Sequence, residues 1–325
     1  MADLDLSSIP REGLALLPTP LHLAPRLSEA LGVEVWFKRD DLTGLGLGGN
    51  KVRPLEFLLG DALARGCDVL VTGSGAQSNW SMLAALAARR CGLDAVVCLY
   101  GDPPAESRGN LLLHGLAGAD LRWTGDPSRA SVDALIERVS DELRQAGRTP
   151  LVVPRGGATA RGSLGYLAAA HEIGAQATTA GLVDPTVWLG TGSCGTQAGL
   201  VAGVAAGFLP RVVGVTVSRP ADECRDRVLM LARGAAEIAG TSAADPSMVS
   251  VIDGFIGPGY GYESPAGAEA AALVARTEGL FLDPPFCAKA MAALVSAVGA
   301  GQVTGPVIML TSGGAPTLFV KDGPL

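Results

Sequence analysis

Short runs of β-branched residues alternate with longer alanine- and leucine-rich segments along most of the chain. In the first half this alternation predicts strands at residues 34–38, 68–72, 94–99 and 151–153 and helices at 78–90, 110–118 and 163–176. In the second half it predicts strands at 186–189, 211–217 and 307–310 and helices at 196–207, 223–240, 266–278 and 288–298. This order is typical of βαβ units and predicts an α/β fold, with mostly parallel sheets covered by helices on both faces.

The same pattern divides the chain into two α/β lobes. The stretch at 177–185 predicts a connection between the two halves of the chain. We predict a large domain formed by residues 1–52 and 164–325 and a small domain formed by residues 53–163, both within the usual size range. A cleft between two such domains is the expected place for a ligand site.

Composition and charge narrow the classes of function. Of the 325 residues, 48% are hydrophobic and 18% are charged, which indicates a compact globular protein rather than a disordered one. The net charge of −7 comes from interspersed acidic and basic residues, so no basic surface for nucleic acid is expected. No apolar stretch is long enough to predict a membrane span, and Asp3 and Asp5 argue against a signal peptide, so we expect a cytoplasmic protein.

The cysteines and histidines do not predict a metal site. The six cysteines are widely spaced with no CxxC pair, and the chain has only three histidines. Scattered cysteines in an intracellular protein are usually small buried apolar residues.

One lysine, Lys51, follows a glycine-rich turn made by Gly48, Gly49 and Asn50. Glycines permit close backbone approach, and a lysine whose pKa is lowered by burial is a nucleophile toward aldehydes. The motif therefore suggests a lysine that forms a Schiff base, although many lysines near glycines are solvated surface residues.

A second glycine-rich loop follows the strand predicted at 186–189 and leads into a helix of small residues. It comprises Gly190, Thr191, Gly192, Ser193, Cys194, Gly195 and Thr196. Backbone amides, hydroxyls and the positive end of the helix dipole converge there, as in an anion site. The loop lacks the GK[ST] ending of a P-loop and departs from GxGxxG, so a single phosphate is expected rather than a nucleotide. A plain strand-to-helix turn is the alternative.

Polar residues also follow the strand at 68–72, at a strand end where ligands bind in open α/β sheets. Asn79 can hydrogen-bond a phenolate oxygen on a cofactor ring, and Ser78 can move a proton, hold a carboxylate or act as a helix N-cap. Gln77 and Trp80 flank them and are expected at a substrate pocket, Trp80 as a wall of the pocket or as a packing residue.

Two later segments complete the candidate set. Tyr260 lies between Gly259 and Gly261 in a tight loop, where its phenol can act as an acid–base group, stack on a ring or have no role. Thr311 and Ser312 follow the strand predicted at 307–310 and either line the cofactor ring or turn the chain.

Taken together, the motifs resemble those of the 1-aminocyclopropane-1-carboxylate (ACC) deaminase/D-cysteine desulfhydrase family. This is a branch of the fold-type II (tryptophan synthase beta-like) enzymes that use pyridoxal 5'-phosphate (PLP). The resemblance spans nearly the whole chain and rests on residues 17–21, 37–41, 48–53, 77–79, 190–196, 259–261, 282–284 and 312–314. The ordered set is specific even though each member alone is not.

The resemblance implies a role for each candidate. Lys51 would carry PLP and move the substrate α-proton, and Asn79 would contact the ring oxygen. Ser78 would be a substrate-side acid–base or carboxylate-binding residue, and Tyr260 would lie near the substrate. The cofactor would also contact residues Asn50, Gly190, Thr191, Gly192, Ser193, Cys194, Gly195, Thr196, Cys287, Thr311 and Ser312. A small amino-acid substrate and a homodimer are implied as well.

Three departures from the family pattern bear on the substrate. Phe286 stands where the deaminases have a tyrosine, so the phenol that assists ring opening is missing. Cys287 replaces the residue expected beside the pyridine nitrogen, where a carboxylate would keep that nitrogen protonated. Trp80 stands where His or Gln commonly occurs, which alters the shape of the pocket.

These departures favour a lyase that eliminates a β-substituent from a small amino acid and releases a keto acid and ammonia, as D-cysteine desulfhydrase does. ACC deamination is ranked lower. A biosynthetic enzyme that catalyses β-replacement or racemisation remains open, as does a degenerate ligand-binding homologue, since fold alone does not establish activity.

Overall fold

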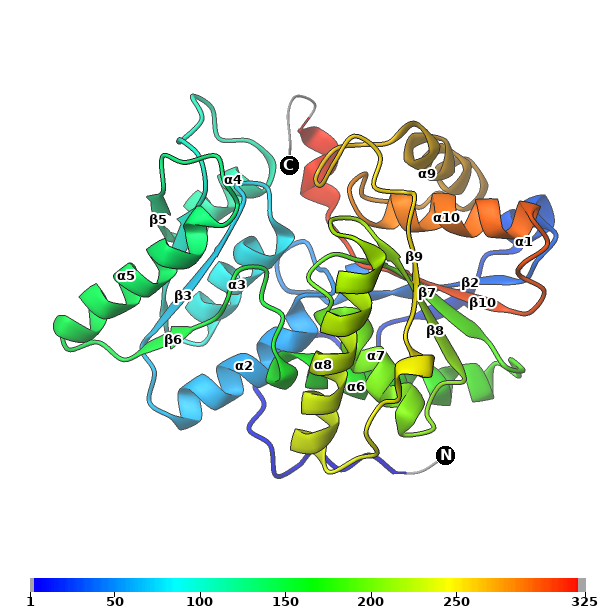
Figure 1. Cartoon of the computed structure of the whole chain (residues 1–325), viewed down its shortest axis with the longest axis horizontal. Coiled ribbons are helices and arrows are strands. Elements are labelled where there is room, and N and C mark those ends of the chain that lie inside the picture. The colour runs from blue at the N-terminus through cyan, green and yellow to red at the C-terminus, as the bar shows by residue number, and fades with distance from the viewer. Residues whose placement is uncertain (1–2, 321–325) are drawn as a thin grey trace.

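The computed structural model describes residues 3–320 and contains two β-sheets flanked by helices (Figure 1). The larger sheet has the strand order β1-β2-β10-β7-β8-β9, and only β1, which pairs with β2, runs antiparallel to its neighbour. Its strands are β1 Leu21–Leu23, β2 Val35–Arg39, β7 Thr186–Thr191, β8 Arg211–Thr216, β9 Ser250–Ile252 and β10 Val307–Thr311. The predicted α/β fold is confirmed.

The smaller sheet is parallel throughout and has the order β5-β4-β3-β6. Its strands are β3 Val69–Ser74, β4 Asp94–Leu99, β5 Asp120–Trp123 and β6 Pro150–Val152. All of them come from one continuous stretch of sequence, whereas the strands of the larger sheet come from both sides of that stretch.

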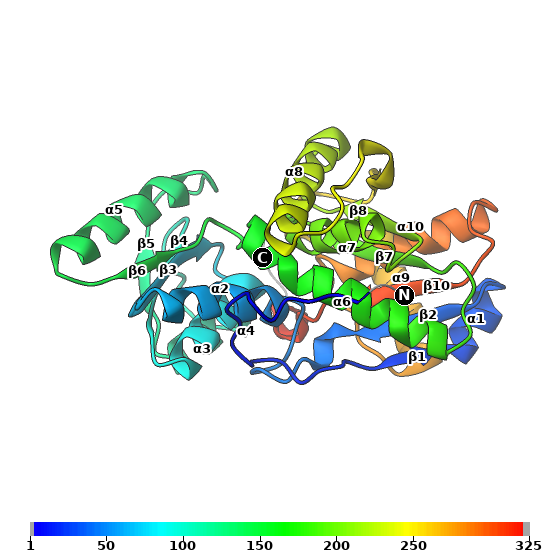
Figure 2. The ribbon, with the colours of Figure 1, turned by 90° about the horizontal axis from the view of Figure 1, so that it is seen from below.

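Helices cover both faces of each sheet, as the two views show (Figures 1 and 2). The larger sheet is covered on one face by α1 Pro25–Leu31, α9 Pro265–Glu278 and α10 Cys287–Gly299 and on the other by α6 Ala160–Thr179, α7 Gly195–Ala205 and α8 Ala221–Ala239. The smaller sheet is covered by α2 Val52–Ala64, α3 Asn79–Arg90 and α4 Gly109–Leu116 on one face and by α5 Ser131–Gln145 on the other. Short 3-10 helices occur at η1 Asp40–Leu42, η2 Pro246–Met248 and η3 Ala315–Phe319.

Some boundaries differ from the sequence-based prediction. The helix predicted at 163–176 is longer in the structure, where it is α6. It begins earlier because Thr159 caps its first turn by accepting a hydrogen bond from the Gly162 amide, and it continues to Thr179. The predicted connection at 177–185 is therefore helical in its first three residues.

Glycines bring α2, α6 and α7 unusually close together. A Cβ at Gly199 of α7 would lie 2.2 Å from the Ser163 carbonyl oxygen, and one at Gly165 of α6 would lie 2.4 Å from the Arg53 backbone. Only glycine fits such contacts without a backbone shift. This packing holds the N-terminus of α2, which follows Lys51, beside the N-terminus of α7.

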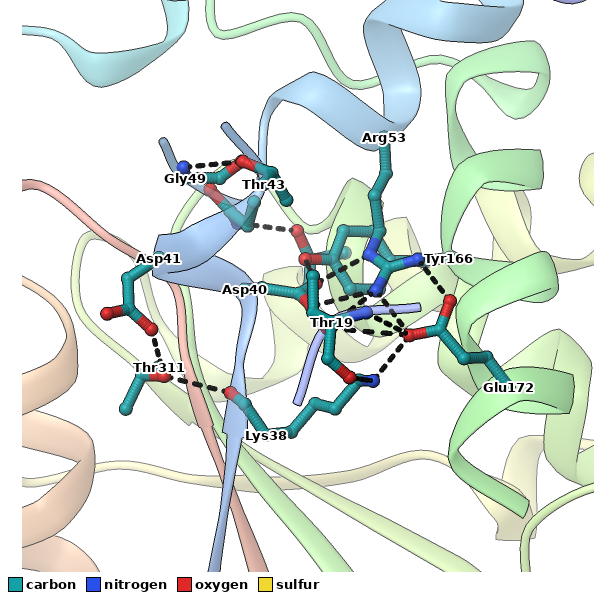
Figure 3. Close-up of polar contacts among 12 residues, drawn as sticks. Thr19, Lys38, Asp40, Asp41, Thr43, Gly49, Arg53, Tyr166, Glu172 and Thr311 are labelled. Carbon is teal, nitrogen blue, oxygen red and sulfur yellow. Dashed lines mark hydrogen bonds and ion pairs between the residues drawn. The ribbon is translucent and has the colours of Figure 1, made fainter. Parts of the chain in front are cut away.

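A buried cluster of charges fixes the same region (Figure 3). The Arg53 guanidinium donates from Nε to Asp40 at 2.7 Å and from Nη1 to Glu172 at 3.0 Å. Lys38 forms an ion pair with Glu172, and the Tyr166 hydroxyl donates to Asp40 at 2.5 Å. The cluster joins β2, η1, α2 and α6 through fully hydrogen-bonded charges, the arrangement that makes buried charges tolerable.

Burial and ion pairing compete at Asp40. Burial raises the pKa of this carboxyl, but the Arg53 charge and hydrogen bonds outweigh burial and hold the pKa below its ordinary value. Asp40 is therefore ionised at neutral pH.

Among residues 3–320, none of the helices is both long and apolar enough to cross a membrane. The same residues contain no cluster of three or more His, Cys, Asp or Glu side chains suited to a metal ion.

Candidate active site

A cavity lies where the carboxyl ends of β3, β7 and β10 meet the loop before α2. It is lined by Asn50, Lys51, Ser78, Asn79, Trp80, Gly156, Gly190, Thr191, Gly192, Ser193, Cys194, Thr196, Tyr260, Phe286 and Ser312. The structure thus brings together most of the residues that the sequence singled out, from segments far apart in the chain. Carboxyl ends of strands in open α/β sheets are where ligands bind.

The Lys51 amine has no partner, unlike those of Lys38 and Lys289, the other lysines among residues 3–320. Lys38 is bound to Glu172, and Lys289 donates to the carbonyl oxygens of Ile256 and Gly259. Within residues 3–320 the Lys51 amine has neither a hydrogen bond nor an ion pair, and burial lowers its pKa from 10.5 to about 8. Lys51 is partly buried and lines the cavity. An unpaired, partly desolvated amine with a lowered pKa is suited to react with an aldehyde.

The loop before Lys51 is held by contacts that need glycine. Gly49 has φ of 136° and Gly48 has φ of 72°, in the region that favours glycine. Thr43 accepts from the Gly49 amide at 2.8 Å, and the Asn50 amide donates to the Ser312 carbonyl oxygen at 2.9 Å. The position of Lys51 is therefore tied to the end of β10.

The loop after β7 has the form of an anion cradle. Cys194, with φ of 76°, is the N-cap of α7, and Cys194 and Thr196 both line the cavity. The N-terminus of α7, with its free backbone amides, therefore lies at the cavity. The Thr191 hydroxyl is buried without a hydrogen-bond partner among the described residues. Asn50 Nδ2 donates to Thr196 Oγ1 at 3.0 Å, which joins this loop to the lysine loop. A buried polar atom without a partner indicates that a ligand completes the site.

The loop after β3 presents Ser78 and Asn79 at the start of α3. Ser78 is the N-cap and accepts from the Trp80 amide at 3.2 Å, so the capping interpretation is correct, and the same residue lines the cavity. Asn79 Oδ1 accepts from Asn110 Nδ2 at 2.7 Å, which fixes its orientation. Trp80 is buried and donates from its indole to Thr72 at 2.8 Å, so it forms a rigid wall.

Two aromatic rings close the opposite side of the cavity. Tyr260 and Phe286 meet edge to face with centroids 6.0 Å apart. The Arg129 guanidinium lies 4.1 Å from the Tyr260 centroid, and burial raises the pKa of the Tyr260 phenol, which is therefore protonated at neutral pH. The sequence did not predict Arg129 or Gly156 at the site, because neither lies in a motif.

Four of the predicted residues do not line this cavity. Gln77 donates to the Arg108 carbonyl oxygen and accepts from the Asn110 amide, and Gly195 faces Ala158 behind the loop. The Thr311 hydroxyl points away, toward Lys38 O and Asp41. Cys287 is buried with its Sγ 3.1 Å from Ser312 Oγ, so Ser312 separates it from the cavity.

Comparison with known proteins assigns the family. Residues 13–313 match the model of a family described as "Pyridoxal-phosphate dependent enzyme". The chain belongs to this family. A relative named D-cysteine desulfhydrase, from Salmonella choleraesuis (strain SC-B67), is 39% identical over an alignment of 325 positions that covers 97% of this chain and 97% of that one.

Solved structures give the same family and fold. A crystal structure described as an ACC deaminase homologue has a TM-score of 0.89 and 35% identity, covering 97% of this chain and 94% of that one. A threonine deaminase from Solanum lycopersicum, at 17% identity and a TM-score of 0.67, shares the fold. The chain is therefore a PLP-dependent enzyme of the lyase type, and the unpaired Lys51 amine and the unpartnered Thr191 hydroxyl fit that cofactor.

The lowered pKa of Lys51 predicts how PLP attaches to the apoenzyme. The rate of covalent attachment should rise with pH up to about 8 and then level off, because only the neutral amine attacks the aldehyde. Stopped-flow absorbance between pH 6 and pH 10 measures this rate. Nα-acetyl-lysine amide serves as a control for titration of PLP itself. A rise that continues to pH 10 in the protein would show that the amine is not desolvated as the structure has it.

Proposed function

We propose that this enzyme catalyses α,β-elimination from a small amino acid, with release of a keto acid and ammonia. The observation that carries the proposal is the partly buried, unpaired Lys51 amine in the same cavity as an anion cradle. The similarity to a D-cysteine desulfhydrase supports the reaction class.

The residues of the cavity divide the work. When bound, PLP supplies an electron sink that stabilises negative charge on the substrate Cα. The amides at the start of α7 and the Thr191 hydroxyl hold its phosphate, and Lys51 Nζ takes the α-proton. Ser78, at the N-terminus of α3, holds the substrate carboxylate or passes a proton, and the protonated Tyr260 phenol stands on the opposite side.

The chemistry of the ring nitrogen follows from Ser312 and Cys287. The Ser312 hydroxyl lines the cavity, and the Cys287 thiol behind it is a neutral neighbour, because burial raises its pKa well above the ordinary value. Neither residue is a carboxylate, so neither would keep the pyridine nitrogen of PLP protonated. Elimination of a good leaving group needs less electron withdrawal than ring opening does, which supports elimination.

Substrate assays test the proposal. We expect pyruvate from β-chloroalanine or cysteine, in at least one enantiomer. We also expect little 2-oxobutyrate from ACC. The kcat/KM for ACC should be lower than that for the best β-substituted substrate by about 10²-fold or more, because Phe286 has no proton to transfer. A coupled lactate dehydrogenase assay measures both keto acids. Absence of product from every β-substituted substrate would refute elimination, and efficient formation of 2-oxobutyrate would favour the deaminase function.

We also propose the assembly and organisation that the sequence suggested. Residues 1–52 and 164–325 form a PLP-binding domain and residues 53–163 a small domain. The division is supported by the two sheets, although α6 crosses the second boundary. A homodimer in the cytoplasm is proposed as well. Six free cysteines, the pattern of proteins in reducing compartments, support that location.

A further inference from the structure

A second cavity, of about 310 Å³, opens beside the first. The two cavities share Ser78, Gly156, Gly192, Ser193 and Tyr260, so the second extends the space beside the proposed reacting carbon. Four arginines line it, together with a single carboxylate, Asp133. No motif in the sequence marks this cavity, because its arginines come from three separate stretches, at residues 129, 155 and 219–227.

Two of the arginines come from the small lobe. Arg155 forms an ion pair with Asp133 at 3.2 Å and is 28% exposed. Arg129 lies over the Tyr260 ring, and within the structure's described residues it forms neither a hydrogen bond nor an ion pair. Arg129 therefore presents its full guanidinium charge beside the aromatic wall of the active site.

The other two arginines come from the large lobe and bind the loop at residues 190–196, here called the phosphate loop. Each donates to a backbone oxygen of this loop, and Arg219 Nη1 also lies 3.7 Å from Cys194 Sγ. Arg219 Nη1 donates to Gly192 O at 2.8 Å, and its Nε pairs at 3.0 Å with Glu223, an exposed residue. Arg227 Nε donates to Ser193 O at 3.2 Å and has no carboxylate partner among residues 3–320. Its remaining guanidinium nitrogens are thus available to a ligand.

The positive charge of this cavity exceeds what the cofactor and the substrate carboxylate require. The phosphate has the amides at the start of α7, and the carboxylate has the N-terminus of α3. Arg129 and Arg155 belong to the other lobe and, among the residues that the structure describes, form no hydrogen bond with the phosphate loop. Clustered guanidinium groups fit tetrahedral oxyanions, which they bind by several charge-assisted hydrogen bonds.

We propose that the substrate carries a second negative charge on its β-substituent, a sulfonate or a sulfate or phosphate ester, and that Arg129 and Arg227 bind it. This inference rests on the proposed function. For cysteate, the Cα–H and Cβ–S bonds break and the Cβ–S electron pair leaves with sulfur as sulfite. Water then hydrolyses the enamine-derived imine, so that cysteate and one water give pyruvate, hydrogen sulfite and ammonium.

A matched substrate pair tests the proposal on the wild-type holoenzyme. Cysteate carries a sulfonate, and 3-(methylsulfonyl)alanine has nearly the same shape without the charge. Both enantiomers of each are assayed for pyruvate. The kcat/KM for cysteate should exceed that for the sulfone by about tenfold or more, because charge-assisted hydrogen bonds are the strong ones. Added salt should raise KM for cysteate and leave KM for the sulfone little changed.

Two variants locate the effect. Arg129→Gln and Arg227→Gln should each lower the ratio of the two kcat/KM values by about tenfold. Arg138→Gln is the control, because Arg138 is an exposed residue of α5 whose one ion pair within residues 3–320 is with Glu142 at 4.0 Å. Thermal melting checks that each variant folds. The salt dependence is measured on the wild type, so it tests the proposal even if a variant does not fold.

The outcomes separate this inference from the function on which it rests. Turnover of β-chloroalanine without preference for cysteate, or a ratio unchanged in both arginine variants, would overturn the anionic subsite and leave elimination standing. No keto acid from β-chloroalanine, cysteate or the sulfone would refute elimination itself.

Discussion

Replacing Lys51 with alanine is expected to abolish covalent cofactor attachment and to lower kcat for keto acid formation by at least about 10²–10⁴-fold, the usual contribution of proton transfer. The reason is that no other described lysine has a free amine, since Lys38 and Lys289 are both hydrogen-bonded. Absorbance of the purified protein reports the attachment, and a coupled assay reports the rate.

The small number of lysines makes it possible to locate the site of cofactor attachment directly. It has only four lysines, at positions 38, 51, 289 and 321, and the last lies outside the described residues. Borohydride reduction followed by peptide mass mapping therefore has four candidate sites, and we expect the adduct on Lys51 alone. An adduct on another lysine, or a Lys51→Ala protein that retains covalently bound cofactor after reduction, would refute the assignment.

Replacing Asp40 with alanine is expected to lower the free energy of unfolding by about 3–5 kcal/mol, the typical cost of removing one partner of a buried ion pair. Asp40 is fully buried and binds Arg53 Nε at 2.7 Å and Nη2 at 2.8 Å. Its removal leaves an incompletely paired guanidinium in the protein interior. Urea unfolding monitored by circular dichroism measures the change.

Asp141→Ala is the matched control, because Asp141 pairs with Arg144 on the exposed face of α5. Its cost should be below about 1 kcal/mol. The pKa of Asp40 in the folded protein lies below its ordinary value of 3.8, so its stabilising effect is complete above that pH and is lost in acid. The difference in stability between the wild type and Asp40→Ala should therefore begin to shrink below about pH 4 and continue to shrink as the pH falls further. A difference that stays constant in acid would contradict the charge-based explanation.

The fold was largely predictable because alanine-rich helices alternate with β-branched strands. Helix α5 escaped that criterion. Its apolar residues Val132, Leu135, Ile136 and Val139 recur with helical spacing, but its outer face is charged rather than alanine-rich. The three-residue strands β1 and β9 were also missed, since pairing with neighbours rather than local composition defines so short a strand.

The candidate site was predictable where chemistry coincided with a glycine loop at a strand end, as for Lys51, Thr191 and Ser78. Side chains reaching in from unmarked segments, such as Arg129, were not. Cys287 illustrates a different limit: sequence placed it near the cofactor, and only the three-dimensional packing shows Ser312 between the thiol and the cavity. Adjacency along a motif does not determine which side chain faces the ligand.

The anchoring of α2 has a mechanical consequence. Arg53, two residues beyond Lys51, is clamped to Asp40 and Glu172, both attached to the larger sheet and its helix α6, whereas Ser78 is attached to the smaller sheet. A hinge motion that separated the two lobes would carry the serine away from the lysine while the lysine and the phosphate cradle kept their spacing. Product could then depart between turnovers without loss of the prosthetic group.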